Sequence, residues 1–249
     1  MRILHLDLET SYIIGATFGL WDTNIAQTLQ DPYILGYGYS WNHLDEVHWV
    51  GMSDFPSFYK KDHTNDKLVV KELHKLVNEA DVIVAHNGKS FDVKKTKGRF
   101  LYHGFEPPSS FQVVDTKLVA KQFGFPSNKL DELGRLLLGE RKIKHDGIEL
   151  WTRCMAKKID EEAWKQMGDY CKQDVILLKK LYKRMLPWID NHPNWNVYED
   201  RPDSCTNCGS GWIKKDGQSY TRTTVRQQYR CKGCGHVMTG ESRRMTTLR

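Results

Sequence analysis

The stretch ILHLDLET, residues 3–10, decides how the rest of the sequence is interpreted. Apolar residues alternate in it with His5, Asp7 and Glu9, a period of two that is typical of a β-strand with one face in the core. We expect this strand to run from Ile3 to Leu8. Because successive side chains point to opposite faces of a strand, the carboxylates of Asp7 and Glu9 lie on the same face.

The segments that follow predict a sheet covered by helices. Runs rich in apolar, aromatic and β-branched residues predict further strands at residues 33–41, 46–50, 81–85 and 112–114. Helical periodicity starts at Asp66, at Phe91, at Asp115 and at a cap formed by Ser127 or Asn128, and the longest helix runs from a cap at Asp160 to about residue 186. Strands first and strand–helix alternation later predict an α/β fold with a mixed central sheet flanked by helices.

Further chemical groups stand at the ends of these elements or on them. Asp92 follows the turn-like HNGKS, residues 86–90, and Tyr170 lies four residues before Asp174 on the long helix, so the last two project to the same side. Asp174 interrupts an apolar stripe, and a carboxylate that faces the core needs a partner such as a metal ion. Acidic oxygens gathered in one place hold hard divalent cations beside a phosphodiester. The pattern favours phosphodiester cleavage.

Length, charge and hydropathy narrow the class of protein. The 249 residues suit one large domain, or one medium domain with an appendage. Residues 201–249 hold ten Lys and Arg against three Asp and Glu, a surplus of seven positive charges, whereas residues 1–200 hold 27 against 28. A basic end on a near-neutral body indicates a polyanionic partner, with a solvated tail as the alternative. Without a membrane-length apolar run or a signal-like start, we expect a cytoplasmic protein.

Four of the six cysteines form two Cys-x-x-Cys pairs separated by 22 residues, namely Cys205, Cys208, Cys231 and Cys234. This spacing predicts one structural Zn²⁺ in a zinc ribbon rather than two disulfides. The gap accommodates a hairpin that turns at Asp216-Gly217. With four thiolates available, His236 is expected to be an exposed neighbour. Cys154 and Cys171 are expected to be small buried hydrophobes.

Basic and aromatic residues alternate in the second strand of this hairpin. Arg222, Arg226 and Arg230 are evenly spaced, so we expect them on one face with Tyr220 beside them. This combination suits contacts with a nucleic-acid backbone and stacking on bases. A ribbon that docks on a partner protein is the alternative.

Taken together, the acidic motifs resemble the DEDD superfamily of 3′–5′ exonucleases, in the subgroup whose third motif carries tyrosine, which has the ribonuclease H-like fold. DELGRLLLGERK (131–142), IELW (148–151) and DYCKQDVILLKKL (169–181) look like the surroundings of the third motif in proofreading domains of family B DNA polymerases. The pattern of FGLWD, AHNGKSFD, FPSNKLDELG, ELW and PWIDNHPN resembles stand-alone exonuclease-like proteins of bacteriophages. The likeness covers roughly residues 1–192. For a protein encoded by a phage, it implies a location in the cytoplasm of the bacterial host.

The resemblance implies a role for each of the four acidic residues and for Tyr170. Asp7, Glu9, Asp92 and Asp174 would bind two Mg²⁺ or Mn²⁺ ions. Asp7 would bridge both ions, Glu9 and Asp174 would complete the site on the side of the attacking water, and Asp92 would serve the leaving-group side. Tyr170 would position the water, because a phenol with a pKa of about 10 is a weak base at neutral pH.

Other residues are candidates for contacts with nucleic acid. Asn87 could bind the 3′ end, and Lys129 is a further candidate, while Phe91 and Trp151 either stack on a base or lie in the core. After Asp92 the sequence departs from the family, which has small or apolar residues there. The basic residues at this point, which include Lys94 and Lys95, either contact the backbone of nucleic acid or form a solvated helix face.

We therefore expect a ribonuclease H-like exonuclease domain at residues 1–192, a linker at 193–203, and a zinc ribbon with a basic tail at 204–249. The predicted function is metal-dependent 3′–5′ exonucleolytic hydrolysis, with DNA favoured over RNA. Expected partners are single-stranded or 3′-ended DNA and a replication or repair protein, with no membrane. The alternatives are a structure-specific endonuclease on the same fold and a non-catalytic nucleic-acid-binding or polymerase-accessory protein.

Overall fold

The structure, a computed structural model, describes residues 1–19, 21, 24–144 and 146–244. The chain divides into two compact units, one formed by residues 2–181 and the other by Met1 with residues 182–249. The division falls inside the longest helix, α7 (Glu161–Met185). Among the described residues, no helix combines the length and the apolar character that a membrane span requires.

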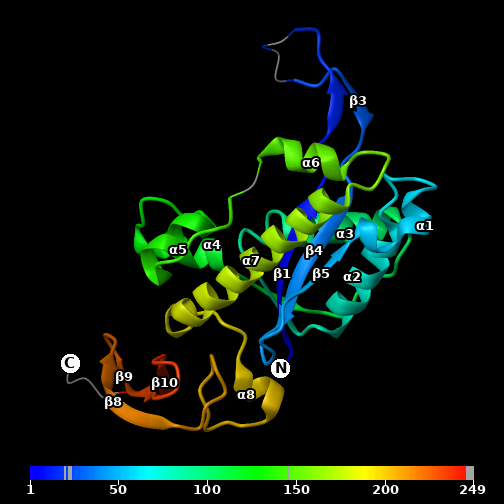
Figure 1. The fold of residues 1–249 in the computed structure, drawn as a ribbon. Coiled ribbons are helices and arrows are strands. Elements are labelled where there is room, and N and C mark those ends of the chain that lie inside the picture. The colour runs from blue at the N-terminus through cyan, green and yellow to red at the C-terminus, as the bar shows by residue number, and fades with distance from the viewer. Residues whose placement is uncertain (20, 22–23, 145, 245–249) are drawn as a thin grey trace. The chain divides into compact units, whose positions relative to one another are not determined.

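A five-stranded sheet forms the centre of the first unit (Figure 1). Its strands, in spatial order, are β5 (His48–Gly51), β4 (Ile34–Trp41), β1 (Ile3–Thr10), β6 (Val82–Ala85) and β7 (Gln112–Asp115). β4 pairs antiparallel with β1 and β5, whereas β6 is parallel to both β1 and β7. This arrangement confirms the predicted mixed sheet, and the strand that carries Asp7 and Glu9 lies at its centre.

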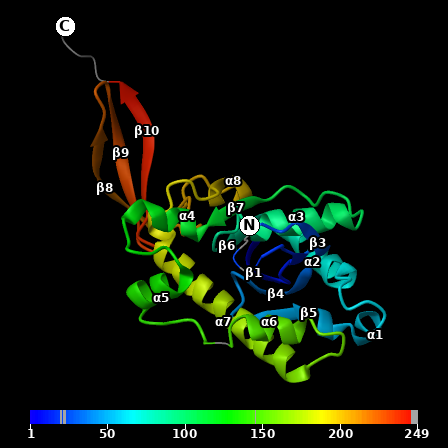
Figure 2. The same cartoon turned by 90° about the horizontal axis from the view of Figure 1, so that it is seen from above.

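Helices cover both faces of this sheet (Figure 2). On one face, α2 (Lys67–Glu79) and α3 (Asp92–Tyr102) bring Val77 and Phe100 together with Leu6 of β1. On the other face, α7 places Cys171 against Asp7. The remaining helices of this unit are α1 (Pro56–Tyr59), α4 (Thr116–Ala120), α5 (Leu130–Leu138) and α6 (Ile148–Cys154), with 3₁₀ turns η1 (Met52–Asp54) and η2 (Lys121–Phe123).

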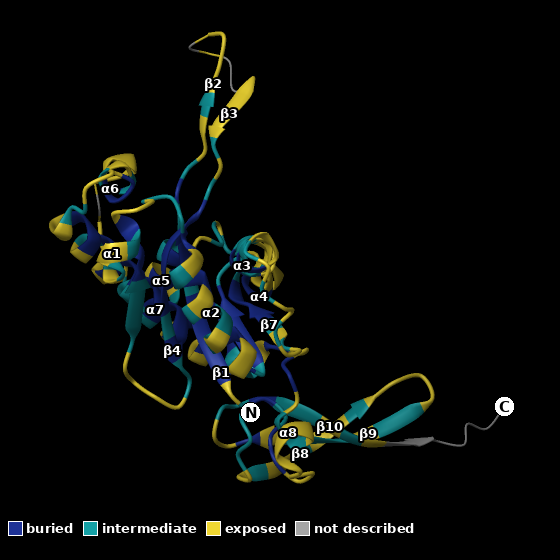
Figure 3. Cartoon of the chain, turned by 90° about the vertical axis from the view of Figure 1, so that its right-hand side faces the viewer, coloured by how far each residue is buried: buried dark blue, intermediate teal, exposed yellow. Residues whose placement is uncertain are grey.

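The alternation in β1 explains why this strand lies at the centre. Leu4, Leu6 and Leu8 are at most 3% exposed and belong to the main hydrophobic core. Figure 3 shows the strands of the sheet mostly buried. Fully burying a leucine side chain contributes about 1.5–3 kcal/mol, so the three leucines fix which face of the strand turns to α2 and α3. Asp7 and Glu9 are thereby turned to the opposite face.

Between β1 and β4 the chain forms a separate two-stranded hairpin, β2 (Ile14–Ala16) and β3 (Gln27–Gln30). The hairpin projects from the body of the first unit and is largely exposed (Figures 1 and 3). The sequence pattern did not predict these strands, because their short runs lack a sustained period of two.

The second unit contains a three-stranded antiparallel sheet of β8 (Ile213–Tyr220), β9 (Thr224–Cys231) and β10 (Val237–Arg244). It also contains η3 (Leu186–Trp188). A short helix, α8 (Trp195–Glu199), lies within residues 193–203, which were predicted to be a linker. α8 forms there because Oδ1 of Asn194 accepts a hydrogen bond from the backbone N–H of Asn196 at 2.9 Å and caps its first turn.

The predicted hairpin turn at Asp216-Gly217 is wrong. Gly217, with φ of 78°, lies within β8, where the register with β9 shifts between Lys215 and Gln218. A positive φ suits a β-bulge as well as a turn, which explains the misplacement. The chain turns instead at Thr221, whose backbone N–H donates to the main-chain oxygen of Thr224 at 2.9 Å.

The two predicted helix caps differ in outcome. Asp160 caps α7, because its Oδ1 accepts from the backbone N–H of Ala163 at 3.0 Å. Neither Ser127 nor Asn128 caps α5, since Lys129 stands at the cap position and makes no side-chain cap bond. The main-chain oxygen of Asn128 is bonded by the His86 ring at 2.9 Å, which places this residue outside the helix.

A buried ion cluster around Asp66 joins three segments of the first unit, and we expect its loss to destabilise the fold. The Asp66 carboxylate, fully buried, accepts from Ile34 N at 2.7 Å and Arg99 Nε at 2.8 Å, and bonds the His103 ring at 2.6 Å. Asp66→Ala leaves these groups without their acceptor and should lower the free energy of unfolding by roughly 3–5 kcal/mol in denaturant titrations. The exposed Asp45→Ala should change it by less than about 0.5 kcal/mol; equal effects would contradict this role.

Candidate functional site

Three elements of the first unit carry the predicted acidic residues. Asp7 and Glu9 lie on β1, Asp92 is the first residue of α3, and Asp174 lies on α7. The backbone N–H of Leu8 donates to Oδ1 of Asp92 at 3.1 Å, which holds the start of α3 against β1. Glu9, Asp92 and Asp174 are at most 8% exposed, whereas Asp7 is partly exposed. Segments far apart in the sequence thus bring four carboxyl groups to one end of β1.

Helix α7 approaches the sheet closely beside Asp7. Sγ of Cys171 lies 3.5 Å from both the main-chain oxygen and Oδ2 of Asp7. One ligand atom each from Asp7, Glu9 and Cys171 lie within 4.8 Å of one another. Gly38 of β4, which pairs with Asp7 of β1, permits this approach, because a Cβ at Gly38 would lie 3.0 Å from the sulfur of Cys171. Cys171 is buried, as the sequence predicted.

The carboxyl groups of this cluster repel one another. Burial, followed by the charge of Asp174, raises the pKa of Asp7 from 3.8 to about 7. Burial and then the charge of Asp7 raise the pKa values of Glu9 and Asp92 well above their usual range. Because the repulsion acts only between charged forms, a cation placed among these groups would lower the free energy of the charged cluster.

Lys142 is a site residue that the motifs did not identify. Its Nζ donates a hydrogen bond to the Tyr170 hydroxyl at 2.6 Å and forms an ion pair with the Asp174 carboxylate. Burial lowers the pKa of Lys142, but Asp174 and Tyr170 more than offset this, so the pKa is raised and the ammonium keeps its charge. The residue lies between α5 and α6, where no periodicity marks it, and its place at the end of DELGRLLLGERK was the one available signal.

Tyr170 lies one turn before Asp174 and is 8% exposed. Its ring packs edge-on against Trp151 of α6, with 6.1 Å between the ring centroids. Burial raises the pKa of the phenol, and the charge of Asp174 raises it further. The hydroxyl therefore stays protonated at neutral pH and can orient a water molecule, but it cannot readily remove a proton from one.

The loop between β6 and α3 is held by Asp115. Its carboxylate accepts hydrogen bonds from the backbone N–H groups of Asn87 and Lys89 at 3.0 and 3.1 Å. Asn87 has a φ of 73°, and its Oδ1 accepts from Nζ of Lys117 at 3.3 Å. Phe91 directly precedes α3 and is partly buried. Contacts of Asn87 and Phe91 with nucleic acid stay predictions.

The predicted basic contacts lie on α3 and just before α5. Lys94 and Lys129 are exposed and Lys95 is partly exposed, so these three ammonium groups can reach a phosphate. Arg99, the last basic residue of the run on α3, instead binds the buried Asp66. The run is therefore divided between a solvated side and a structural ion pair, and its contacts with nucleic acid stay predictions.

In the second unit the four paired cysteines lie together. The sulfur of Cys205 lies 3.7 Å from that of Cys234, the sulfurs of Cys208 and Cys231 are also 3.7 Å apart, and all four lie within 4.8 Å of one another. All four are free thiols. The backbone N–H of Gly233 donates to Sγ of Cys231 at 3.2 Å, which stabilises a negative sulfur. Four sulfur atoms in this arrangement can hold a metal ion.

Two predictions about the neighbours of the cysteines are wrong. Arg222 lies in the bend between β8 and β9, because the hairpin turns later than expected, and only Arg226 and Arg230 lie on β9. His236 is 8% exposed rather than open to solvent, since Nδ1 of its ring forms a hydrogen bond with the main-chain oxygen of Pro187 at 2.9 Å. Of the two exposed arginines on β9, Arg230 is bound by Asp216, with Nε and Oδ2 2.6 Å apart.

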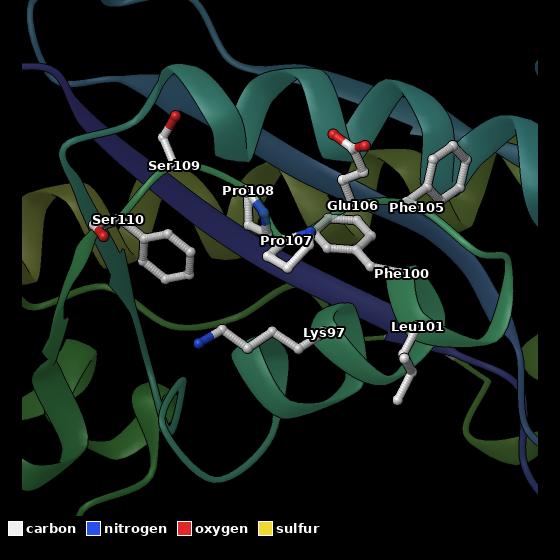
Figure 4. A pocket seen from close by; sticks show the side chains of 10 residues that line it. Lys97, Phe100, Leu101, Phe105, Glu106, Pro107, Pro108, Ser109 and Ser110 are labelled. Carbon is white, nitrogen blue, oxygen red and sulfur yellow. The ribbon is translucent and has the colours of Figure 1, made fainter.

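A separate hollow lies at the other end of α3 from Asp92 (Figure 4). It has a volume of about 450 Å³ and is lined mainly by apolar side chains, among them Phe100, Phe105 and Phe111. Nζ of Lys97 lies 5.1 Å from the centroid of the Phe111 ring. The described lining residues do not include the acidic cluster, so this hollow is not part of the candidate site.

Comparisons with known proteins bear on the fold. A search among curated proteins gave no match. The structure is similar to the family B DNA polymerase from the hyperthermophilic archaeon Pyrobaculum calidifontis, with a TM-score of 0.50 and 16% sequence identity. The likeness covers 75% of this chain and 25% of the polymerase, so the chain spans about a quarter of that protein's length. At this identity the likeness concerns the fold alone.

A family model described as the RNase H superfamily matches residues 36–186. The matched range contains Asp92, Tyr170 and Asp174 and begins after β1. It confirms the predicted ribonuclease H-like fold class. Because the match spans more than half of the sequence, the chain belongs to the RNase H superfamily.

Proposed function

We propose that this chain is a metal-dependent exonuclease that hydrolyses phosphodiester bonds of nucleic acid from the 3′ end. The observation that carries the proposal is the convergence of Asp7, Glu9, Asp92 and Asp174 from β1, α3 and α7. A protein that only binds nucleic acid gains nothing from buried carboxylates near phosphates. The 3′–5′ direction and the preference for DNA over RNA rest on the resemblance of the tyrosine-type motif to proofreading domains.

The donor set fits two Mg²⁺ or Mn²⁺ ions. All four groups are carboxylates, the hard oxygen ligands that these ions prefer. The raised pKa values of Asp7, Glu9 and Asp92 indicate that protons relieve the repulsion among the carboxylates, and a divalent cation can take over that role. We assign Asp7 to both ions, Glu9 and Asp174 to the side of the attacking water, and Asp92 to the leaving-group side. Bound ions would stabilise the charge on the entering and leaving oxygens.

Tyr170 of α7 and Lys142, from the segment between α5 and α6, act together. Lys142 holds the phenol oxygen through its hydrogen bond, which orients the hydroxyl proton away from the ammonium. The hydroxyl then positions water for attack, and its raised pKa excludes it as the group that accepts the proton at neutral pH. The Lys142 ammonium also forms an ion pair with Asp174 and so offsets part of the negative charge of the cluster.

For the second unit, we propose a zinc ribbon that adds affinity for nucleic acid. A tetrahedral Zn²⁺ with bonds of about 2.3 Å has sulfur–sulfur edges of about 3.8 Å, close to the 3.7 Å of the Cys205–Cys234 and Cys208–Cys231 pairs. We place the exonuclease domain at residues 1–192, the linker at 193–203 and the ribbon at 204–249, of which 245–249 lie outside the described residues. Exposed Arg226, Tyr220 and Trp212 suit backbone and base contacts, with a replication or repair protein as the alternative partner.

Asp174→Asn should abolish most hydrolysis while the fold survives. The change removes one charge from the cluster and should lower turnover more than about 100-fold, since even indirect supports of a metal site are worth 10–100-fold. Asp169→Asn, on the exposed side of the same helix, is the matched control and should keep wild-type turnover. A 5′-labelled single strand with Mg²⁺ should give a descending ladder, and EDTA should stop it.

Other outcomes of this digestion identify the alternatives. Immediate release of the labelled mononucleotide would mean the opposite polarity, and cleavage of closed circles would mean an endonuclease. Binding without any cleavage by the wild-type chain, on DNA and on RNA, would make it a non-catalytic binder.

The stability of the metal-free protein should fall as pH rises through the window set by Asp7. Its pKa is 3.8 ordinarily and about 7 in the folded chain, so the folded state holds the proton more tightly and loses stability between about pH 4 and 7. Mg²⁺ must displace these protons, so it should raise the melting temperature more at pH 8 than at pH 5. Thermal unfolding with EDTA or Mg²⁺ measures both effects. Asp7→Asn should weaken both, and an unchanged Mg²⁺ shift in that variant would refute the assignment.

The chain should bind one Zn²⁺ through its paired cysteines. Native mass spectrometry should find one zinc per chain, and Cys234→Ser should lose it, whereas Cys154→Ser, a buried thiol of the first unit, should keep it. After denaturation with a chelator, all six thiols should react with a thiol reagent. Four missing thiols would instead indicate two disulfides.

A further inference from the structure

The hairpin of residues 11–33, which includes β2 and β3, exposes several large apolar side chains. Phe18 and Trp21 are each 94% exposed, and Leu29 is 63% exposed. Large exposed apolar side chains gathered on one element mark an interaction site more often than single exposed ones do. A two-stranded hairpin is only marginally stable in water by itself, which also favours a partner for it.

The base of the hairpin is fixed to the body of the first unit. Ser11 and Tyr33 are joined twice, by Ser11 N to the Tyr33 main-chain oxygen and by Tyr33 N to Ser11 Oγ, each at 2.9 Å. The Tyr12 hydroxyl lies 3.0 Å from Oγ1 of Thr152 on α6. These contacts hold both ends of the hairpin, while β2 and β3 project from the body of the first unit (Figure 1).

The fixed base lies beside the acidic cluster. The hairpin begins two residues after Glu9, and Thr152 is next to Trp151, whose ring packs on Tyr170. From Glu9 to Phe18 an extended chain reaches at most about 30 Å. This equals about nine nucleotides stacked at about 3.4 Å. A strand whose end lies in the acidic cluster is therefore within reach of the hairpin.

The charge of the hairpin decides which part of such a strand it can bind. Residues 11–33 contain no Lys or Arg and two Asp, so they offer no cation to a phosphate. Aromatic rings bind nucleic acid without cations by stacking on base faces, and they do so with little dependence on sequence. The bases of an unpaired strand are thus the partner that fits both the apolar tip and its place beside the cluster.

We propose that Phe18 and Trp21 stack on unpaired bases of the nucleic-acid strand upstream of the end that is hydrolysed. This inference rests on the proposed nuclease function, to which it adds single-stranded character of the substrate near the site. The hairpin contributes affinity that does not depend on salt, because stacking releases no counterions.

The test compares full-length chains in an Asp174→Asn background, so that the strand is not degraded. Phe18→Ala/Trp21→Ala should bind a long single-stranded oligonucleotide about tenfold more weakly, with an unchanged slope of log affinity against log salt. Leu101→Ala/Tyr102→Ala, which removes two side chains that are 82% and 72% exposed at the far end of α3, is the matched control and should bind like its parent. With Asp174 restored, the hairpin variant should hydrolyse a dinucleotide at the wild-type rate.

Several results would overturn the inference. These are unchanged affinity for the long strand, a loss accompanied by a shallower salt slope, or an equal loss in the Leu101/Tyr102 control. A dimer seen by sedimentation of the wild type and lost in the hairpin variant, with unchanged affinity, would assign the hairpin to a second copy of the chain. If the wild type binds the long strand but hydrolyses neither substrate, the proposed nuclease function is wrong. The binding comparison between the hairpin variant and its parent still decides whether Phe18 and Trp21 stack on bases.

Discussion

Four carboxyl groups repel one another at one end of β1, and the rest of the first unit has to offset the cost of holding them together. Burial, and after it the charges of neighbouring carboxylates, raise the pKa values of Asp7, Glu9 and Asp92, so the cluster works against the folded state near neutral pH. The leucines on the opposite face of β1 offset this cost, because their burial holds the strand in register. A fold that keeps such a cluster is expected to gain stability from bound cations.

Lys142 shows how the chain manages this repulsion without a metal ion. Its position depends on α5, because the Lys142 backbone N–H donates to Oδ1 of Asp131 at 2.9 Å and Arg141 pairs with the same carboxylate at 2.6 Å. α5 in turn lies close to α7, since a Cβ on Gly134 would lie 3.0 Å from the side chain of Leu177. The ammonium group is thus placed by packing between helices, and it neutralises part of the charge that Asp174 adds to the cluster.

Residues that follow a period were predictable, and residues placed only by tertiary contacts were not. The alternation in β1 gave the shared face of Asp7 and Glu9, and the helical stripe gave the buried side of Asp174. Lys142 was not predicted as a site residue, because it lies on an irregular segment, where a side chain's surroundings come only from tertiary packing. The hairpin turn was misplaced because Gly217 suits a bulge and a turn equally well, and only the pairing of β8 with β9 distinguishes them.

The distribution of charge along the chain separates two kinds of contact with a polyanion. Residues 201–249 carry a surplus of seven positive charges, whereas residues 11–33 carry no Lys or Arg. Contacts between cations and phosphates weaken steeply with salt, and stacking contacts do not. If both segments bind one strand, the second unit adds to the ionic part of the affinity, and the hairpin beside the acidic cluster supplies a part that survives high salt. The affinity for the strand would then fall at high salt, while the strand stays aligned at the site, because alignment and ionic attraction come from different residues.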